Sequence, residues 1–249
     1  MSMRILIRTE VLKLTTIRGP LILTVATLAV TALLGAQPVL KAGRNGLPSI
    51  GTVGAELAVL DAMGRGAIAG LVIGVLIMTL EFRHQTVTAS LLVSPRRPEL
   101  IAAKAVTAGL AGLLLGVAAM VIVVSIGTIG GAMQISLING DVALRGLGLL
   151  LTYPLYALIG LGIGALIARN QPLAVILPVL WVVWLESFAL SSLGHQLTLW
   201  SIGGTAAALQ NTGNLPQVLP IWLGAGTLLG YALIFSISGA IRISRADIS

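Results

Sequence analysis

Long, uninterrupted apolar runs constrain this chain more than any other feature of its sequence. A hydrocarbon core of about 30 Å needs about 20 helical residues to cross it. Six segments are long and apolar enough: residues 20–37, 62–80, 101–127, 147–168, 172–190 and 219–241. None shows the strict alternation of a barrel strand, and only helices and closed barrels satisfy their backbone in lipid. The sequence therefore predicts an all-α integral membrane protein with six transmembrane helices, which form a single transmembrane domain over residues 1–249.

The distribution of charge supports a membrane location and indicates an orientation. Only 9% of the residues are charged, against about 25% in soluble domains. The net charge of +7 is interpreted as the excess of Lys and Arg on cytoplasmic flanks, not as a nucleic-acid-binding surface. With a cytoplasmic N-terminus, eleven basic residues lie inside and four lie outside, namely Lys41, Arg44, Arg65 and Arg145. Both termini are therefore predicted to be cytoplasmic.

Two segments outside the predicted spans are expected to contact the membrane, one by its modest amphipathicity and the other because it is too apolar for an ordinary aqueous loop. Residues 1–19 place Ile7, Val11 and Leu14 on one helical face, although Glu10 interrupts it, which predicts an interfacial helix that turns into the first span at Gly19-Pro20. Residues 191–218 contain LTLWSIGGTAAALQ. This stretch is either a pair of short re-entrant helices broken at Gly203-Gly204 or an amphipathic surface helix.

The sequence lacks the motifs of the common catalytic sites. It has no cysteine, no Gly-Lys dipeptide of a P-loop and no G-x-S-x-G elbow. His84 and His195 are too far apart in sequence for an H-E-x-x-H site, and each is interpreted as a surface or interfacial residue. The chain is therefore predicted not to be an enzyme and to bind no metal or cofactor of its own.

Two groups of charged residues in or near the spans are candidates for function. Asp61 and Arg65 are four residues apart, a spacing that lets them pair on one helix face, and they are interpreted as an interfacial pair at the entry to the second span. Glu186 lies about 14 residues into the fifth predicted span, roughly 20 Å from its cytoplasmic end. An intramembrane carboxylate suggests a substrate or proton pathway, although from this depth the side chain could also reach the outer aqueous phase.

One polar connector, residues 81–100, separates the second and third spans. Thr86 or Thr88 can cap a short helix through Leu92, and Ser94-Pro95 ends it. Pro98-Glu99 then begins the third span, with a proline and an acid in its first turn. The pattern predicts a short cytoplasmic helix that exposes apolar residues to a partner.

This connector resembles the corresponding region of ABC type-2 permeases. In that family an acid that ends span two precedes a basic residue, a threonine, a hydrophobic turn, Ser-Pro, a basic residue and a lysine that enters span three. The matching residues, in order, are Glu81, Arg83, Thr86, Leu91, Leu92, Ser94, Pro95, Arg96, Arg97 and Lys104. Gln85 replaces the glycine that often precedes the threonine. The N-terminal TEVLKLTTIRGP and the C-terminal RISRADI also resemble actinobacterial-type members.

The resemblance implies the permease subunit of an ATP-driven exporter in a bacterial inner membrane. The connector would be the coupling helix that binds an ABC ATPase subunit, present in two copies, and the N-terminal helix would brace it. ATP and Mg²⁺ would be bound by that partner. A second permease copy or a homologous permease would pack against spans one and five. The substrate would be hydrophobic or amphipathic, such as a drug, an antibiotic peptide or a lipid-like molecule, so the exporter would contribute to multidrug efflux or antibiotic resistance.

Two other functions are compatible with the residues. A proton-coupled secondary transporter would use Glu186, although the sequence shows no inverted repeat or paired broken helices. A non-transporting membrane scaffold or immunity protein would need only the apolar helices and a regulatory partner.

Overall fold

The computed structural model describes residues 3–44, 47–83, 97–132, 140–167, 170–185, 198–211 and 219–245. Within these ranges the chain is helical and contains no strand. In chain order the elements are α1 (Met3–Thr16), α2 (Arg18–Leu40), α3 (Val53–Gly66), α4 (Ile68–Arg83), α6 (Arg97–Ile129), α7 (Gly140–Leu166), α8 (Gln171–Leu180), the π-helix η1 (Trp181–Leu185), α11 (Ile202–Leu209) and α12 (Ile221–Arg245). The prediction of an all-α protein is confirmed.

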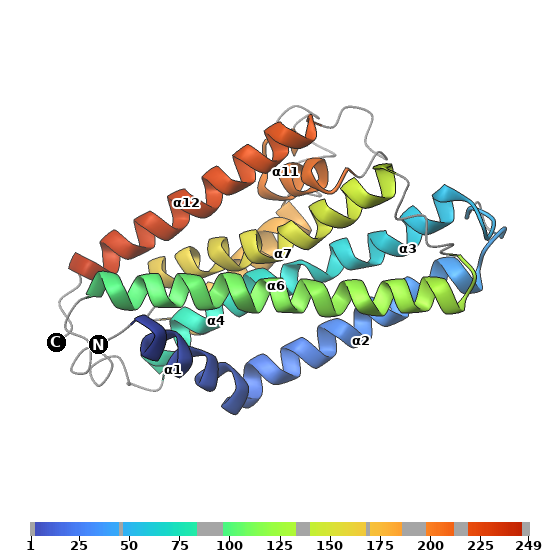
Figure 1. Cartoon of the computed structure of the whole chain (residues 1–249). Helices are drawn as coiled ribbons and strands as arrows, with labels where there is room; N and C mark the ends of the chain where they lie inside the picture. Colours follow the sequence, from blue (N-terminus) through green and yellow to red (C-terminus); the bar gives the residue numbers. More distant parts are fainter. Residues whose placement is uncertain are drawn as a thin grey trace.

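Five helical segments are long and apolar enough to cross a membrane: Arg18–Leu40, Val53–Leu80, Glu99–Ile129, Gly140–Leu166 and Ile221–Ile243. They contain the first, second, third, fourth and sixth predicted spans, or nearly all of each. The described part of the fifth predicted span consists of the shorter α8 and η1. Since α7 ends and α12 begins at opposite ends of the bundle (Figure 1), the chain must return along it between them. Part of that return lies outside the described residues, so the sixth crossing stays a prediction.

The ends of the elements define the two ends of the bundle. The start of α1, the end of α4, the start of α6 and the end of α12 lie together at what we call the connector end (Figure 1). The end of α2, the start of α3, the end of α6 and the start of α7 lie at the opposite end (Figure 1). Residues 84–96, between α4 and α6, fall outside the described residues, but both of their attachment points are therefore at the connector end.

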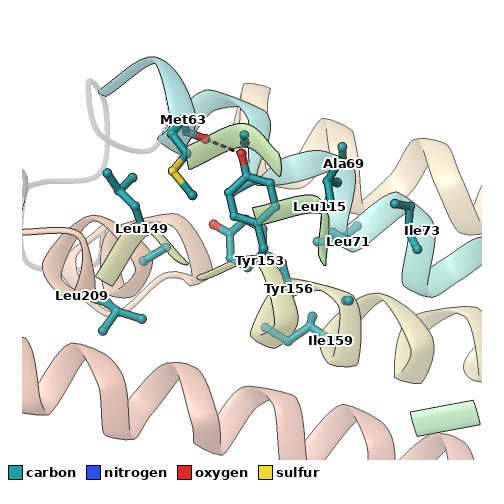
Figure 2. Packing of buried hydrophobic residues seen from close by; sticks show 14 of the residues in the cluster. Met63, Ala69, Leu71, Ile73, Leu115, Leu149, Tyr153, Tyr156, Ile159 and Leu209 are labelled. Carbon is teal, nitrogen blue, oxygen red and sulfur yellow. Dashed lines mark hydrogen bonds between the residues drawn. The ribbon is translucent and has the colours of Figure 1, made fainter. Parts of the chain in front are cut away.

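The second and fourth spans form the centre of the bundle. Most residues of Val53–Leu80 and Gly140–Leu166 are buried, whereas only a minority are buried in the other three spans. Tyr153 of α7 is fully buried and donates a hydrogen bond of 2.8 Å from its hydroxyl to the Met63 carbonyl of α3. Figure 2 shows this ring among Leu71, Leu115 and other apolar side chains. The bond satisfies the buried hydroxyl and ties α7 to α3.

Glycines allow the central helices to approach closely. An added Cβ would contact the Tyr153 carbonyl oxygen at 2.7 Å from Gly70 in α4 and at 2.7 Å from Gly112 in α6. In this way α7 is approached closely by α4 on one side and by α6 on another. Small residues that recur every four positions in these spans permit such close approach. In α12, Gly226 and Gly230 have the same four-residue spacing, but an added Cβ would meet nothing within 4 Å at either position. These two glycines therefore do not serve packing within the described part of the chain.

The outer helices carry many exposed apolar side chains. Exposed large residues include Leu21, Ile22, Val25, Val30 and Leu33 of α2, Leu110, Leu114, Val117 and Val121 of α6, and Trp222, Leu229, Leu233, Ile234 and Ile237 of α12. Such surfaces are incompatible with water and compatible with lipid. The molecule is therefore a transmembrane protein.

Two predicted boundaries at the end opposite the connector were wrong by about two helical turns. Thr52 caps α3 by accepting a hydrogen bond from the Ala55 amide at 3.3 Å, so the helix begins at Val53 and not near residue 62. Similarly, α7 begins at Gly140 and takes Arg145 into the bundle.

The N-terminal helix ends before Ile17, which has an extended backbone, and Pro20 lies inside the first turn of α2, where a missing amide costs little.

The predicted break at Gly203-Gly204 was also wrong. Helix α11 runs through both glycines and starts one residue after Ser201, whose hydroxyl accepts a hydrogen bond from the Gly204 amide at 3.0 Å. All residues of α11 are buried or partly buried, and it packs against α12 and α7. The helix is covered by protein and does not lie on the surface; its entry into the outer leaflet stays a prediction.

Candidate functional site

The structure anchors the predicted coupling connector at both ends. Glu81 and Arg83 lie in the last turn of α4, and Arg97 is the first residue of α6. The other proposed contacts with an ATPase lie outside the described residues: Thr86, Leu91, Leu92, Ser94, Pro95 and Arg96. Pro98 and Glu99 occupy the first turn of α6, as the sequence predicted.

A buried ion pair joins the N-terminal helix to the start of α6. The Lys104 ammonium donates to Glu10 Oε2 at 2.8 Å, and these residues are only 1% and 3% exposed. The same ammonium lies 3.5 Å from the Ile77 carbonyl of α4. Lys13 donates to Glu10 Oε1 at 2.7 Å. Because Lys104 contacts α1 and α4 from α6, one side chain ties three helices together next to the connector.

Apolar packing surrounds this ion pair. Leu6, Leu100 and Ala103 are buried in one cluster, with Ile7 packed against it. Leu6 and Ile7 precede Glu10 by four and three positions, so both lie next to it on the same side of α1. We call the ion pair, its Lys13 and Ile77 contacts and this cluster the connector root. It packs α1 against the start of α6, and the Lys104 side chain links both helices to α4.

The connector root has a sequence signal that local patterns alone do not reveal. The pattern of residues 1–19 presents Glu10 as an interruption of an apolar face, and the family resemblance presents Lys104 only as the lysine that enters the third span. A buried charge needs a partner of opposite sign. An acid on the buried face of one helix and a lysine two turns into an apolar helix are complementary, and in the structure each is the other's partner.

The second feature is an apolar cavity beside Leu71 of α4. Its volume is about 440 Å³, within the range of pockets that hold small organic molecules. Five elements besides α4 contribute to its wall. The lining residues are Leu71, Ile163, Leu166, Ile167, Leu177, Pro178, Trp181, Val182, Ser201, Ile202, Tyr231 and Phe235. It has no charged side chain and suits a hydrophobic ligand.

The π-helix η1 forms part of this cavity and leads directly to Glu186. Trp181 and Val182 of η1 line the cavity, and Pro178 interrupts the preceding α-helical hydrogen bonding. Single π-helical turns often occur at functional sites. Glu186 itself lies outside the described residues, so its proposed pathway role stays a prediction.

Asp61 pairs with a residue other than the one the spacing suggested. Its carboxylate accepts a hydrogen bond from Arg145 of α7, while Arg65 attracts it electrostatically from the same helix. Arg145 was placed in an outer loop by sequence and is instead 5% exposed. The pair links α3 to α7 at the end of the bundle opposite the connector. In the described ranges, no three His, Cys, Asp or Glu side chains are grouped as metal ligands.

Comparison of the chain with protein-family models and with curated proteins finds no match.

Proposed function

We propose that this chain is the permease subunit of an ATP-binding cassette exporter of the type-2 class. The observation that carries the proposal is the connector root, in which the buried Glu10–Lys104 pair fixes α1, α4 and α6 to one another. A connector that transmits force needs firmly fixed attachment points, and these contacts fix the helices on both sides of it. The resemblance of residues 81–104 to the coupling region of these permeases supplies the nature of the partner, an ABC ATPase.

In this proposal ATP and Mg²⁺ are bound by two ATPase subunits. Closure of the ATPases moves the connector, and the connector root passes that movement to the inner ends of α4 and α6. Helix α7 follows because it packs closely against both. A second permease copy or a homologue completes the pathway, and both termini face the cytoplasm of a bacterial inner membrane. Two-state movement of packed helices is a common basis for such coupling.

The proposed substrate is hydrophobic or amphipathic. The cavity of about 440 Å³ has an apolar wall and aromatic side chains at Trp181, Tyr231 and Phe235. An ion or a sugar would lose its hydration there without compensating hydrogen bonds. A drug, an antibiotic peptide segment or a lipid-like molecule would not.

Replacing Leu91 and Leu92 with alanine is expected to abolish export and the stimulation of ATPase activity while membrane insertion stays normal. If both leucines are buried at the docking surface, truncating them costs about 2–5 kcal/mol of binding, at about 0.8 kcal/mol for each CH₂ group removed from the contact. Export of a fluorescent hydrophobic dye and ATP hydrolysis by the complex are measured together. The matched control is Leu113→Ala with Leu114→Ala, two exposed leucines of α6. Normal export by the connector variant would contradict the docking role.

A proton-coupled transporter is the second candidate, because η1 lines the apolar cavity and runs directly into Glu186. In that case Glu186→Gln would remove the dependence of transport on a proton gradient, and no ATPase would be needed. Under the exporter proposal the same variant continues to export as long as ATP is supplied. The third reading, a membrane scaffold or immunity protein, predicts no transport by any variant.

A further inference from the structure

A polar pocket lies at the end of the bundle opposite the connector, between α2, α3 and α7. It has a volume of about 480 Å³ and is far more polar than the apolar cavity. Asp61, Arg65, Arg145 and Gln37 contribute its polar wall, and Leu34, Pro38, Leu47, Pro48 and Leu57 are among its apolar neighbours. The pocket shares no residue with the connector root or with the apolar cavity.

Arg145 is a buried cation whose hydrogen bonding is incomplete. Its side chain is 6% exposed, and one terminal nitrogen donates to Asp61. Its Nε, also buried, has no hydrogen-bond partner in the described part of the chain. A buried donor without an acceptor costs about 1–3 kcal/mol, and more for a charged group. Arg145 lines the pocket, so a shift of its side chain that exposes Nε to an acceptor on a ligand would recover that cost.

The charges in the pocket do not cancel. Arg65 and Arg145 bring two guanidinium groups, and Asp61 brings one carboxylate, so one positive charge remains. Guanidinium groups present several N–H donors in a plane that matches an oxyanion. Asp61 holds Arg145 in place, and the exposed Arg65 is available from the neighbouring wall. The side-chain amide of Gln37 can add a neutral donor.

We propose that this pocket binds a phosphate oxyanion. A phosphate group has at least three oxygens that can accept hydrogen bonds from two guanidinium groups at once. A carboxylate has only two such oxygens. The apolar neighbours of the pocket suit the remainder of a phosphate ester better than they suit a fully hydrated ion. The phosphate can belong to an anionic lipid headgroup or to free phosphate, and the two sources are separated by experiment.

The test uses the purified full chain in maltoside detergent, which carries no phosphate. Inorganic phosphate and short-chain phosphatidylglycerol are titrated in separate calorimetry experiments. Arg65→Gln is expected to weaken binding about tenfold, since it removes one charged hydrogen-bond donor. Asp61→Asn is expected to strengthen binding, because the carboxylate no longer competes for Arg145. Arg44→Gln is the control: this exposed residue follows α2 at the same end of the bundle and does not line the pocket.

Opposite changes in the Arg65 and Asp61 variants, with no change in the Arg44 variant, would support the pocket as the site. Binding of phosphatidylglycerol alone would assign a lipid headgroup, and binding of inorganic phosphate would assign a free anion. Absence of binding by either probe would overturn the proposal. Equal loss in the Arg44 and Arg65 variants would also overturn it, since it would indicate general surface charge. If Asp61→Asn does not fold, Arg65→Gln against Arg44→Gln decides the question. None of these outcomes depends on an ATPase partner.

Discussion

Lys104→Met is expected to destabilise the protein by on the order of 3 kcal/mol and to release α1 from α6. The substitution keeps a long side chain but leaves the Glu10 carboxylate buried without its main partner. Removing one member of a buried ion pair is costly because the remaining charge is still dehydrated. Lys13 retains its contact with Glu10, so the loss falls at the lower end of the usual range. Thermal unfolding and protease sensitivity of residues 3–16 in detergent measure the two effects.

The double variant Glu10→Gln with Lys104→Met is expected to recover most of this loss, because neither buried position then carries a charge and the remaining Lys13 is partly exposed to solvent. Replacing both members of a buried pair is often nearly neutral. A double-mutant cycle with the two single variants therefore gives a strong coupling energy. Arg8→Gln serves as the control, since Arg8 is an exposed basic residue on the same helix. Additive effects of the two single variants would show that the pair contributes little to stability.

Gly160→Ala is expected to destabilise the protein by about 3 kcal/mol. The new Cβ would collide with the Leu71 backbone carbonyl of α4, and a backbone atom cannot move aside as a flexible side chain can. Overpacking in a tight core costs about 1–3 kcal/mol or more. This position lies in the packed centre formed by α4 and α7, so the helices must separate to admit one methyl group. Thermal unfolding of the purified variant measures the loss.

Gly230→Ala provides the matched control with the opposite expected sign. A Cβ at Gly230 would meet nothing within 4 Å. Alanine has a higher helix propensity than glycine by up to about 1 kcal/mol, so this variant should be neutral or slightly more stable. Similar destabilisation by both variants would contradict the close α4–α7 packing as the cause. Loss of stability at Gly230 only in a larger oligomer would indicate that α12 contacts another chain.

The class of the fold and most of the helices could be predicted from the sequence, because hydrophobic length is a direct requirement of the bilayer. The runs that contain Gly112 and Gly160 are apolar throughout, and helices form over both. The prediction was weaker at the helix ends, where capping decides. Thr52 adds about two turns to α3, and no change in hydropathy marks that start.

The partners of the buried charges could not be predicted from local spacing. Asp61 and Arg65 satisfy the four-residue rule for one helix face, yet the hydrogen bond to Asp61 comes from Arg145, 84 residues away. Glu10 and Lys104 are 94 residues apart and meet only because α1 folds back against α6. The sequence marks Glu10 and Lys104 each as a charge that needs a partner, but at this separation it does not specify which residue the partner is. The proposed docking residues Leu91 and Leu92 and the proposed pathway residue Glu186 lie outside the described residues and stay predictions.

Affinity purification of the tagged protein in mild detergent, followed by mass spectrometry of the proteins that co-elute, tests the exporter proposal most directly. The proposal predicts a P-loop ATPase in stoichiometric amount, which is lost when Leu91 and Leu92 are replaced by alanine and retained when Leu113 and Leu114 are replaced. Recovery of the chain without any ATPase, under conditions that keep it folded, would contradict the proposal and direct attention to proton-coupled transport through Glu186.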